Sequence, residues 1–131
     1  MASAQSDAIE DRVRARVIND DPLYRAVPVS LRFVPAEPLA VRIVFPPGLS
    51  PENTENEWVF PLVLLETGLQ SPTGSGDVRV WPAGRVQTVV ELHSPEGVAV
   101  IQFDSAALRR FLRRTYAVTG TAPPRRTPVT R

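Results

Sequence analysis

Hydrophobic and polar residues alternate along several short stretches of this chain, with the period of two that is typical of half-buried β-strands. Residues 29–33 and 39–45 alternate in this way around the turn sequence PAEP, which predicts a hairpin with one buried face. EWVF at residues 57–60 and DVRVW at residues 77–81 predict two further short strands.

The first segment, residues 8–18, fits two different periods. Arg12, Arg14 and Arg16 alternate with apolar residues as in a strand, yet the apolar residues from Ile9 onward also fit a helical stripe. Its β-branched content favours a strand.

The clearest hairpin in the pattern spans residues 85–103, with SPEG as its turn. Val86, Thr88, Val90 and Leu92 are predicted to share its buried face.

Two stretches have the period and the boundaries of helices. PLVLLETG at residues 61–68 begins with a proline suited to the first helical position, and Gly68 suits the position just after a helix. Residues 104–120 place apolar side chains at helical spacing, with Asp104 or Ser105 as the N-cap. The opposite face of this second helix carries Arg109, Arg110, Arg113 and Arg114.

Length and composition fit one globular domain of α+β class. The chain has 131 residues, and its 14 prolines suit antiparallel sheets of about seven short strands and two helices, in the order β-β-β-β-α-β-β-β-α. Residues 1–8 and the Pro- and Arg-rich residues 118–131 are expected to be disordered, which leaves residues 9–117 as the domain. The sequence has no membrane-length apolar run and no export signal pattern, so we expect a cytoplasmic protein.

Charge is divided unevenly along the chain. Residues 1–104 hold 8 arginines and 14 acidic residues, a net charge of −6, whereas residues 105–131 hold 7 arginines and no acidic residue. All 15 basic residues are arginine, which suggests GC-rich coding. The basic C-terminal part predicts an interaction surface or a solvated tail.

Few residues are suited to catalysis. The chain has no cysteine and one histidine, His93, which excludes cysteine-based and two-histidine metal sites and favours a solvent-facing hairpin residue. The stretch SPTGSGDVRVWP at residues 71–82 has glycines like a phosphate-binding loop, but a helix precedes it and a strand follows, the reverse of that motif. We therefore predict a turn, with Asp77 bonding local amides at the strand entrance. No cofactor is expected.

The two tryptophans allow two interpretations. Trp58 or Trp81, near arginines on a strand, would suit stacking with single-stranded nucleic acid. A large core or interface residue is the more frequent role, and it is the one we favour.

A series of short motifs follows in one linear order through the middle of the chain. It comprises EWVF at 57–60, Leu64-Leu65, Gly68-Leu69, Pro72-Thr73-Gly74, the segment 76–82, SPEG at 94–97 and Phe111-Leu112-Arg114-Thr115. Together with a first hairpin at residues 27–45, these motifs resemble the SsgA-like proteins, actinobacterial regulators of sporulation and cell division. The residues that we expect to carry the motif or its structure are Trp58, Gly68, Gly74, Gly76, Asp77, Arg79, Trp81 and Pro82.

The resemblance implies a non-enzymatic protein with a fold similar to that of the Whirly single-stranded DNA-binding proteins, assembled as a homotrimer. In this family SsgB-type proteins recruit the tubulin-like division protein FtsZ, and SsgA-type proteins position SsgB. The expected partners are therefore FtsZ or other SsgA-like proteins at the division septum, and the expected contact surface is the arginine face of the last helix. Many members carry a further acidic helix where this chain has PPRRTPVTR.

A second hypothesis, a single-stranded nucleic-acid-binding module, follows from the Whirly-like fold, Trp81 and the C-terminal arginines. The net negative charge of residues 1–104 weakens it, because phosphate binding is driven by positive charge. An enzyme is the third and least supported class.

Overall fold

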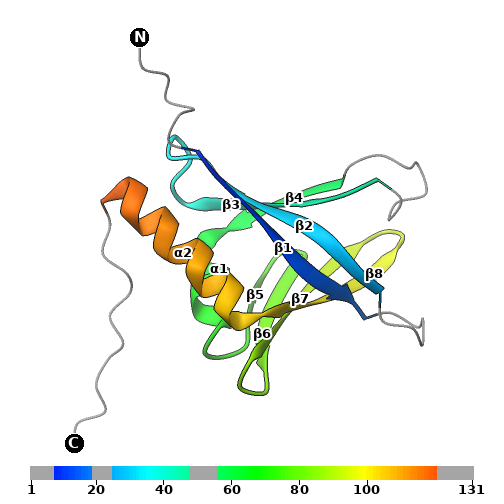
Figure 1. Cartoon of the computed structure of the whole chain (residues 1–131). Coiled ribbons are helices and arrows are strands. Elements are labelled where there is room, and N and C mark those ends of the chain that lie inside the picture. Colours follow the sequence, from blue (N-terminus) through cyan, green and yellow to red (C-terminus); the bar gives the residue numbers. More distant parts are fainter. Residues whose placement is uncertain (1–7, 19–24, 48–55, 121–131) are drawn as a thin grey trace, which may run out of the picture.

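Eight strands form one strongly twisted antiparallel sheet in the computed structural model, which describes residues 8–18, 25–47 and 56–120 (Figure 1). The elements in chain order are β1 (Ile9–Val17), β2 (Arg25–Phe33), β3 (Ala40–Phe45), β4 (Asn56–Pro61), α1 (Leu62–Gly68), β5 (Thr73–Ser75), β6 (Val78–Ala83), β7 (Gln87–Ser94), β8 (Gly97–Asp104) and α2 (Ser105–Thr119). Neighbouring strands follow the order β4-β3-β2-β1-β8-β7-β6-β5.

The sheet consists of two four-stranded meanders that meet at its centre. β1 pairs with β2 over its whole length, from Ile9 opposite Phe33 to Val17 opposite Arg25. It pairs with β8 at only three positions, from Ala15 opposite Phe103 to Val17 opposite Ile101. This short contact makes β1 a central strand, so the sheet has its free edges at β4 and β5.

The alternating pattern places one face of every strand except β5 in a single hydrophobic core. Leu31 and Phe33 on β2, Val41 and Ile43 on β3, and Val80 on β6 are almost completely buried. α2 adds Leu108, Phe111 and Leu112 to the same core. Burial of these apolar side chains is the main stabilising contribution to such a fold.

The two helices lie near each other at one end of the sheet (Figure 1). The Tyr116 hydroxyl on α2 donates a hydrogen bond of 2.6 Å to Glu66 Oε2 on α1. Arg114 on α2 forms an ion pair with Asp11 on β1. α2 therefore ties the first meander to the helix that follows it.

The predicted fold class is confirmed, with one strand more than expected. Thr73–Ser75 forms β5 because it pairs with residues 78–80 of β6, and three residues are too few to give a readable alternation. The first segment is a strand, as its β-branched residues predicted. The likeness to Whirly proteins and the trimer stay predictions.

Several local predictions at the helix ends are corrected by the structure. Pro61 lies just before α1, as its N-cap. Gly68 is the last residue of α1, not the residue after it, and the C-cap is Leu69 with φ −69°. A glycine is needed at 68 because a Cβ there would lie 2.2 Å from Val80 Cγ1.

α2 begins and ends close to the predicted residues. Asp104 occupies the N-cap position, but its side chain makes no capping bond and accepts a hydrogen bond of 2.9 Å from Gln87 Nε2. Gly120 ends the helix with φ 71°. Helix thus continues two residues beyond the expected domain end at 117. The rest of the predicted tail, 121–131, and residues 1–7 of the predicted N-terminal tail lie outside the described residues.

One side-chain prediction in the long hairpin is wrong. Thr88, Val90 and Leu92 are buried on β7 as expected, but Val86 precedes the strand and is 66% exposed. The alternation therefore begins at β7 itself and does not extend into the turn before it.

Candidate protein-interaction surface

The motif stretch at residues 71–82 folds as a tight hairpin, which confirms the turn over the phosphate loop. β5 and β6 pair from Thr73 opposite Val80 to Ser75 opposite Val78. Gly76 stands in the turn with φ 59°, a conformation that glycine adopts without steric cost. No helix N-terminus follows this loop, so the geometry that holds a phosphate is missing from it.

β6 presents its alternate residues to opposite faces of the sheet. Val78 and Val80 point into the core, and Val80 packs on Gly68. Arg79 is exposed and Trp81 is half-buried on the outer face. One short strand thus supplies both a core contact and a surface.

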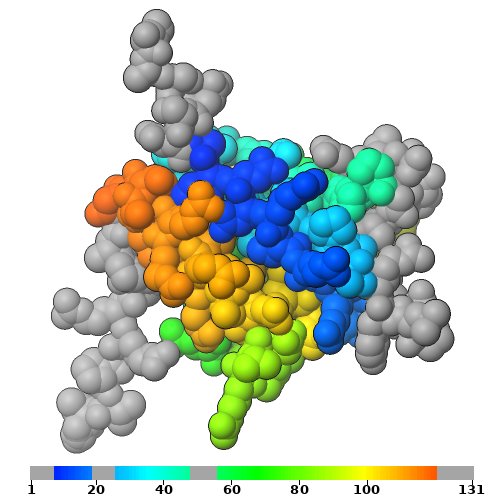
Figure 2. Space-filling model, in the orientation of Figure 1, coloured from blue at the N-terminus to red at the C-terminus, as the bar shows by residue number. Residues whose placement is uncertain are grey.

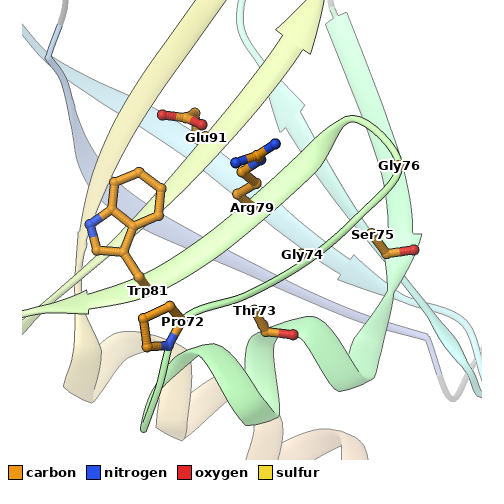
Figure 3. A pocket seen from close by; sticks show the side chains of 8 residues that line it. All are labelled: Pro72, Thr73, Gly74, Ser75, Gly76, Arg79, Trp81 and Glu91. Carbon is orange, nitrogen blue, oxygen red and sulfur yellow. The ribbon is translucent and has the colours of Figure 1, made fainter.

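The outer face at this hairpin is hollowed into an open depression of about 620 Å³. Its walls are formed by residues 72–76 together with Arg79, Trp81 and Glu91 (Figure 3). In Figure 3 the Trp81 ring and the Arg79 side chain rise side by side from β6, with Pro72 beside the tryptophan. The depression therefore combines an aromatic surface with a guanidinium group.

Gly74 lies directly across the strand pair from Arg79 and leaves room for its side chain. A Cβ at position 74 would lie 3.1 Å from Arg79 Cγ and 3.2 Å from the Val78 carbonyl oxygen. The arginine stem can consequently lie over the β5 backbone.

Arg79 forms no ion pair within the described part of the chain, although an acidic residue lies opposite it. Glu91 is its partner in the β6–β7 register, but Glu91 Oε1 lies 2.6 Å from His93 Nε2. His93 is thus half-buried and bonded, not simply solvent-facing as predicted. The five donors of the Arg79 guanidinium stay available to an external acceptor.

The other motif residues have structural positions. Trp58 on β4 is half-buried and packs against the core, as favoured over stacking, and Pro82 is half-buried on β6 opposite Thr88. Asp77 is exposed, and its backbone carbonyl, not its carboxylate, accepts a hydrogen bond of 2.8 Å from the His93 amide. The expected bonds from the Asp77 carboxylate to local amides are wrong for the described residues.

The arginines of α2 lie on its exposed face, as predicted. Arg109, Arg110, Arg113 and Arg114 are all exposed, whereas the residues between them pack into the core. Arg114 is engaged with Asp11 of β1, so it fixes α2 to the sheet. Among the described residues, none of α2 lines the depression on the β5–β6 hairpin.

An apolar patch at the free β4 edge was not found from the sequence. Leu39 is 81%, Val63 54% and Val59 49% exposed. Their backbones lie near the same end of the β3–β4 pair, because the Leu62 amide donates to the Leu39 carbonyl oxygen and Val59 pairs with Arg42 of β3. The alternation of residues 39–45 predicts a buried Leu39, but β3 begins at Ala40, so Leu39 belongs to the preceding turn and is exposed.

The described residues contain no group of three or more His, Asp or Glu side chains that could hold a metal ion. Across the same ranges, 8–18, 25–47 and 56–120, there is also no helix with the length and apolar character needed to cross a membrane.

Comparison with known proteins gives concordant matches. A model of the family described as Streptomyces sporulation and cell division protein, SsgA, matches residues 27–122. The sporulation-specific cell division protein SsgB of Streptomyces coelicolor is 47% identical over 94 residues, which are 70% of this chain and 66% of that protein. SsgB of Salinispora tropica is 37% identical over 121 residues, 90% of this chain and 84% of that protein.

Solved structures agree with these matches. An SsgB structure, described with mutations that correlate to longitudinal cell division during sporulation of Streptomyces coelicolor, superposes with a TM-score of 0.73 at 36% identity, over 84% of this chain and 87% of that chain. An SsgA-like sporulation-specific cell division protein of Thermobifida fusca superposes with a TM-score of 0.78 at 31% identity, over 94% and 89%. The chain therefore belongs to the SsgA family of sporulation and cell-division proteins.

Proposed function

We propose that this chain acts in sporulation-specific cell division without catalysis, by contacting other division proteins at the septum. Family membership supports the process, since the relatives carry names from sporulation-specific cell division. The observation that carries the mode of action is the open depression at the β5–β6 hairpin, where motif residues Arg79 and Trp81 face solvent.

These two residue types suit protein contact. Tryptophan and arginine are enriched among the residues that dominate binding energy at protein interfaces. A half-buried indole offers apolar area with little entropy cost, and an unpaired guanidinium binds a carboxylate or a backbone carbonyl. The depression is open to solvent, so a protruding side chain of a partner can enter it.

The partner we propose is the host's FtsZ or another SsgA-like protein. Two measurements test this together. Deletion of the gene should reduce or misplace sporulation septa, and the purified chain should bind immobilised FtsZ or the host's SsgA and SsgB. Normal septation in the deletion strain, with no binding to any of these proteins, would refute the proposal.

We also propose that the chain assembles as a homo-oligomer, with a trimer as the expected form. The patch formed by Leu39, Val59 and Val63 at the free β4 edge supports this, because it offers exposed apolar area beside unpaired strand edge. Val59→Glu should shift the chain to a smaller species in sedimentation velocity. Glu10→Gln, on the same sheet but away from that edge, is the control. An unchanged sedimentation coefficient in Val59→Glu would exclude this edge as the interface.

A further inference from the structure

The outer face of β1 carries three arginines in a row, Arg12, Arg14 and Arg16, which we call the β1 strip. All three are exposed. The residues between and beside them face the other way: Ile9 and Ala15 are buried, and Asp11 meets Arg114 of α2. The β1 strip therefore lies on the side of the central strand that points away from the core. Figure 2 shows β1, in blue, running across an open face of the molecule with α2, in orange, beside it.

On the neighbouring strands β2 and β3, the arginines of this outer face with described side chains, Arg32 and Arg42, are paired. Arg32 Nε lies 3.5 Å from Glu10 Oε1. Arg42 forms an ion pair with Glu37, and its Nη1 atom lies 3.5 Å from Glu57 Oε1. The hydrogen bond and the charge of Glu37 raise the pKa of Arg42.

The β1 strip has no such partners among the described residues. Its neighbours on β2 are Ser30, Pro28 and Ala26, opposite Arg12, Arg14 and Arg16 in turn. On β8, Gln102 lies opposite Arg16. Like charges at adjacent outward positions repel one another, so the β1 strip does not stabilise the isolated chain. Charge without internal compensation is a common mark of a binding surface.

The spacing of the β1 strip is that of an extended chain. Two residues of strand advance about 6.7 Å, so the three guanidinium stems leave the sheet at regular steps over about 13 Å. The side chains beside them on β2, Ala26, Pro28 and Ser30, are small and uncharged, so they do not obstruct a segment that lies over the arginines. A second extended segment lying along β1 would bring every second side chain to an arginine.

We propose that the β1 strip binds an extended acidic segment of a protein, with carboxylates at alternate positions meeting Arg12, Arg14 and Arg16. Each carboxylate would accept hydrogen bonds from one guanidinium, a geometry for which arginine is better suited than lysine. This surface is distinct from the β5–β6 depression, so the inference goes beyond the proposed function and does not depend on it.

The surroundings favour a short acidic segment over a long polyanion. On β2 and β3, Arg32 and Arg42 are already paired with Glu10, Glu37 and Glu57, so the positive charge beyond the β1 strip on that side is neutralised and offers little to a long nucleic-acid backbone or an anionic membrane. The strand of the β1 strip and its two neighbours also offer no surface for base stacking, because Phe33 and Phe103, the aromatic residues of β1, β2 and β8, are buried.

Fluorescence anisotropy with synthetic peptides tests the proposal. The probe is a labelled peptide of about nine residues in which glutamate alternates with threonine, so that its acidic face has the strand repeat. The comparison peptide has the same composition with its glutamates contiguous. The variant is Arg12→Gln/Arg14→Gln/Arg16→Gln, and the matched control is Arg109→Gln/Arg110→Gln/Arg113→Gln on α2, which removes the same charge from another exposed surface.

The proposal predicts that the alternating peptide binds better than the contiguous one and that binding weakens as salt increases. The β1 triple variant should weaken it at least about tenfold, and the α2 triple variant less than about twofold. Thermal melting should be alike in both variants, since none of the six arginines is buried.

Three results would overturn the proposal. Equal losses in the two triple variants would mean that only net charge matters. Equal binding of the two peptides would show that the spacing of the carboxylates along the peptide does not matter. Binding of a single-stranded oligonucleotide or of phosphatidylglycerol vesicles through the β1 strip, without binding of the alternating peptide, would assign the surface to a different class of partner.

Discussion

The two faces of the sheet at β6 differ in how closely their side chains are packed and paired within the protein. On the inner face Val80 is fully buried and fits against Gly68 with no room for another carbon. On the outer face Arg79 and Trp81 border an open depression, and Arg79 has no ion pair among the described residues. Residues next to each other in sequence therefore serve different purposes: the inner face determines the fold, and the outer face is available for contacts.

The largest effect should come from adding one carbon to the inner face. Gly68→Ala would place a Cβ 2.2 Å from Val80 Cγ1 and 2.5 Å from Val80 Cβ, so α1 must move away from β6. We expect a loss of about 3 kcal/mol in the free energy of unfolding, measured by urea denaturation. Gly74→Ala is the control, because its new carbon would lie 3.1 Å from Arg79 Cγ and 3.2 Å from the Val78 carbonyl oxygen, a much smaller overlap than at Gly68. Similar stability of the two variants would contradict the close packing of α1 on β6.

Two neighbouring residues on opposite faces sharpen the comparison. Val80→Ala opens a cavity in the core and should cost about 2 kcal/mol of unfolding free energy. Trp81→Ala should cost less than about 1 kcal/mol, although it removes far more atoms, because Trp81 borders solvent and is only partly buried. The same denaturation experiment measures both. A greater loss in Trp81→Ala than in Val80→Ala would show that the outer face also supports the fold.

A smaller effect is expected where α2 meets α1. Tyr116→Phe removes the hydrogen bond to Glu66 and should lower the unfolding free energy by about 1 kcal/mol at neutral pH. Burial first, then the hydrogen bond and charge of Glu66, raise the pKa of Tyr116 well above its ordinary value.

The sign of the pH dependence follows from that raised pKa. Because the folded-state pKa exceeds the unfolded one, this contribution is fully present below about pH 10 and is lost as the pH rises beyond it. The stability difference between the parent chain and Tyr116→Phe should therefore shrink in alkaline buffer. If the stability difference between the parent chain and Tyr116→Phe stayed constant up to pH 11, the difference would not come from the Tyr116 hydroxyl.

The smallest effect should come from an ion pair on the outer face. Glu10→Gln removes the acidic partner of Arg32, and both side chains are well exposed. We expect a change below about 0.5 kcal/mol in unfolding free energy, because exposed ion pairs are screened by solvent. A loss above about 1 kcal/mol would show that charge pairing on this face holds the sheet together.

Much of the fold could be predicted because strand alternation and helix periodicity are local. The strands around residues 29–33 and 39–45, the 85–103 hairpin and α2 all follow from the pattern. The eighth strand, β5, could not be predicted from the pattern, because its three residues are too few to show an alternation. Nor could the β1–β8 pairing, which joins residues more than eighty positions apart and depends on the whole core.

The candidate surface was predictable only in part. Motif residues Gly74, Gly76, Arg79 and Trp81 were singled out, and the structure brings them together in one depression. Their relation to Glu91 and His93 could not be foreseen, because it depends on the β6–β7 register. The arginines at 12, 14 and 16 were visible as an alternation, but their lack of acidic neighbours appears only when β2 and β8 are placed beside β1.

The most direct test of the central claim is the affinity of Arg79→Ala/Trp81→Ala for the host's FtsZ, SsgA and SsgB, measured by biolayer interferometry beside the parent chain. Arg85→Ala, an exposed arginine in the turn before β7, is the matched control. The account predicts a melting temperature close to that of the parent and at least about a tenfold loss of affinity for one of these proteins, with Arg85→Ala unchanged. Full affinity for every partner in the double variant would contradict it.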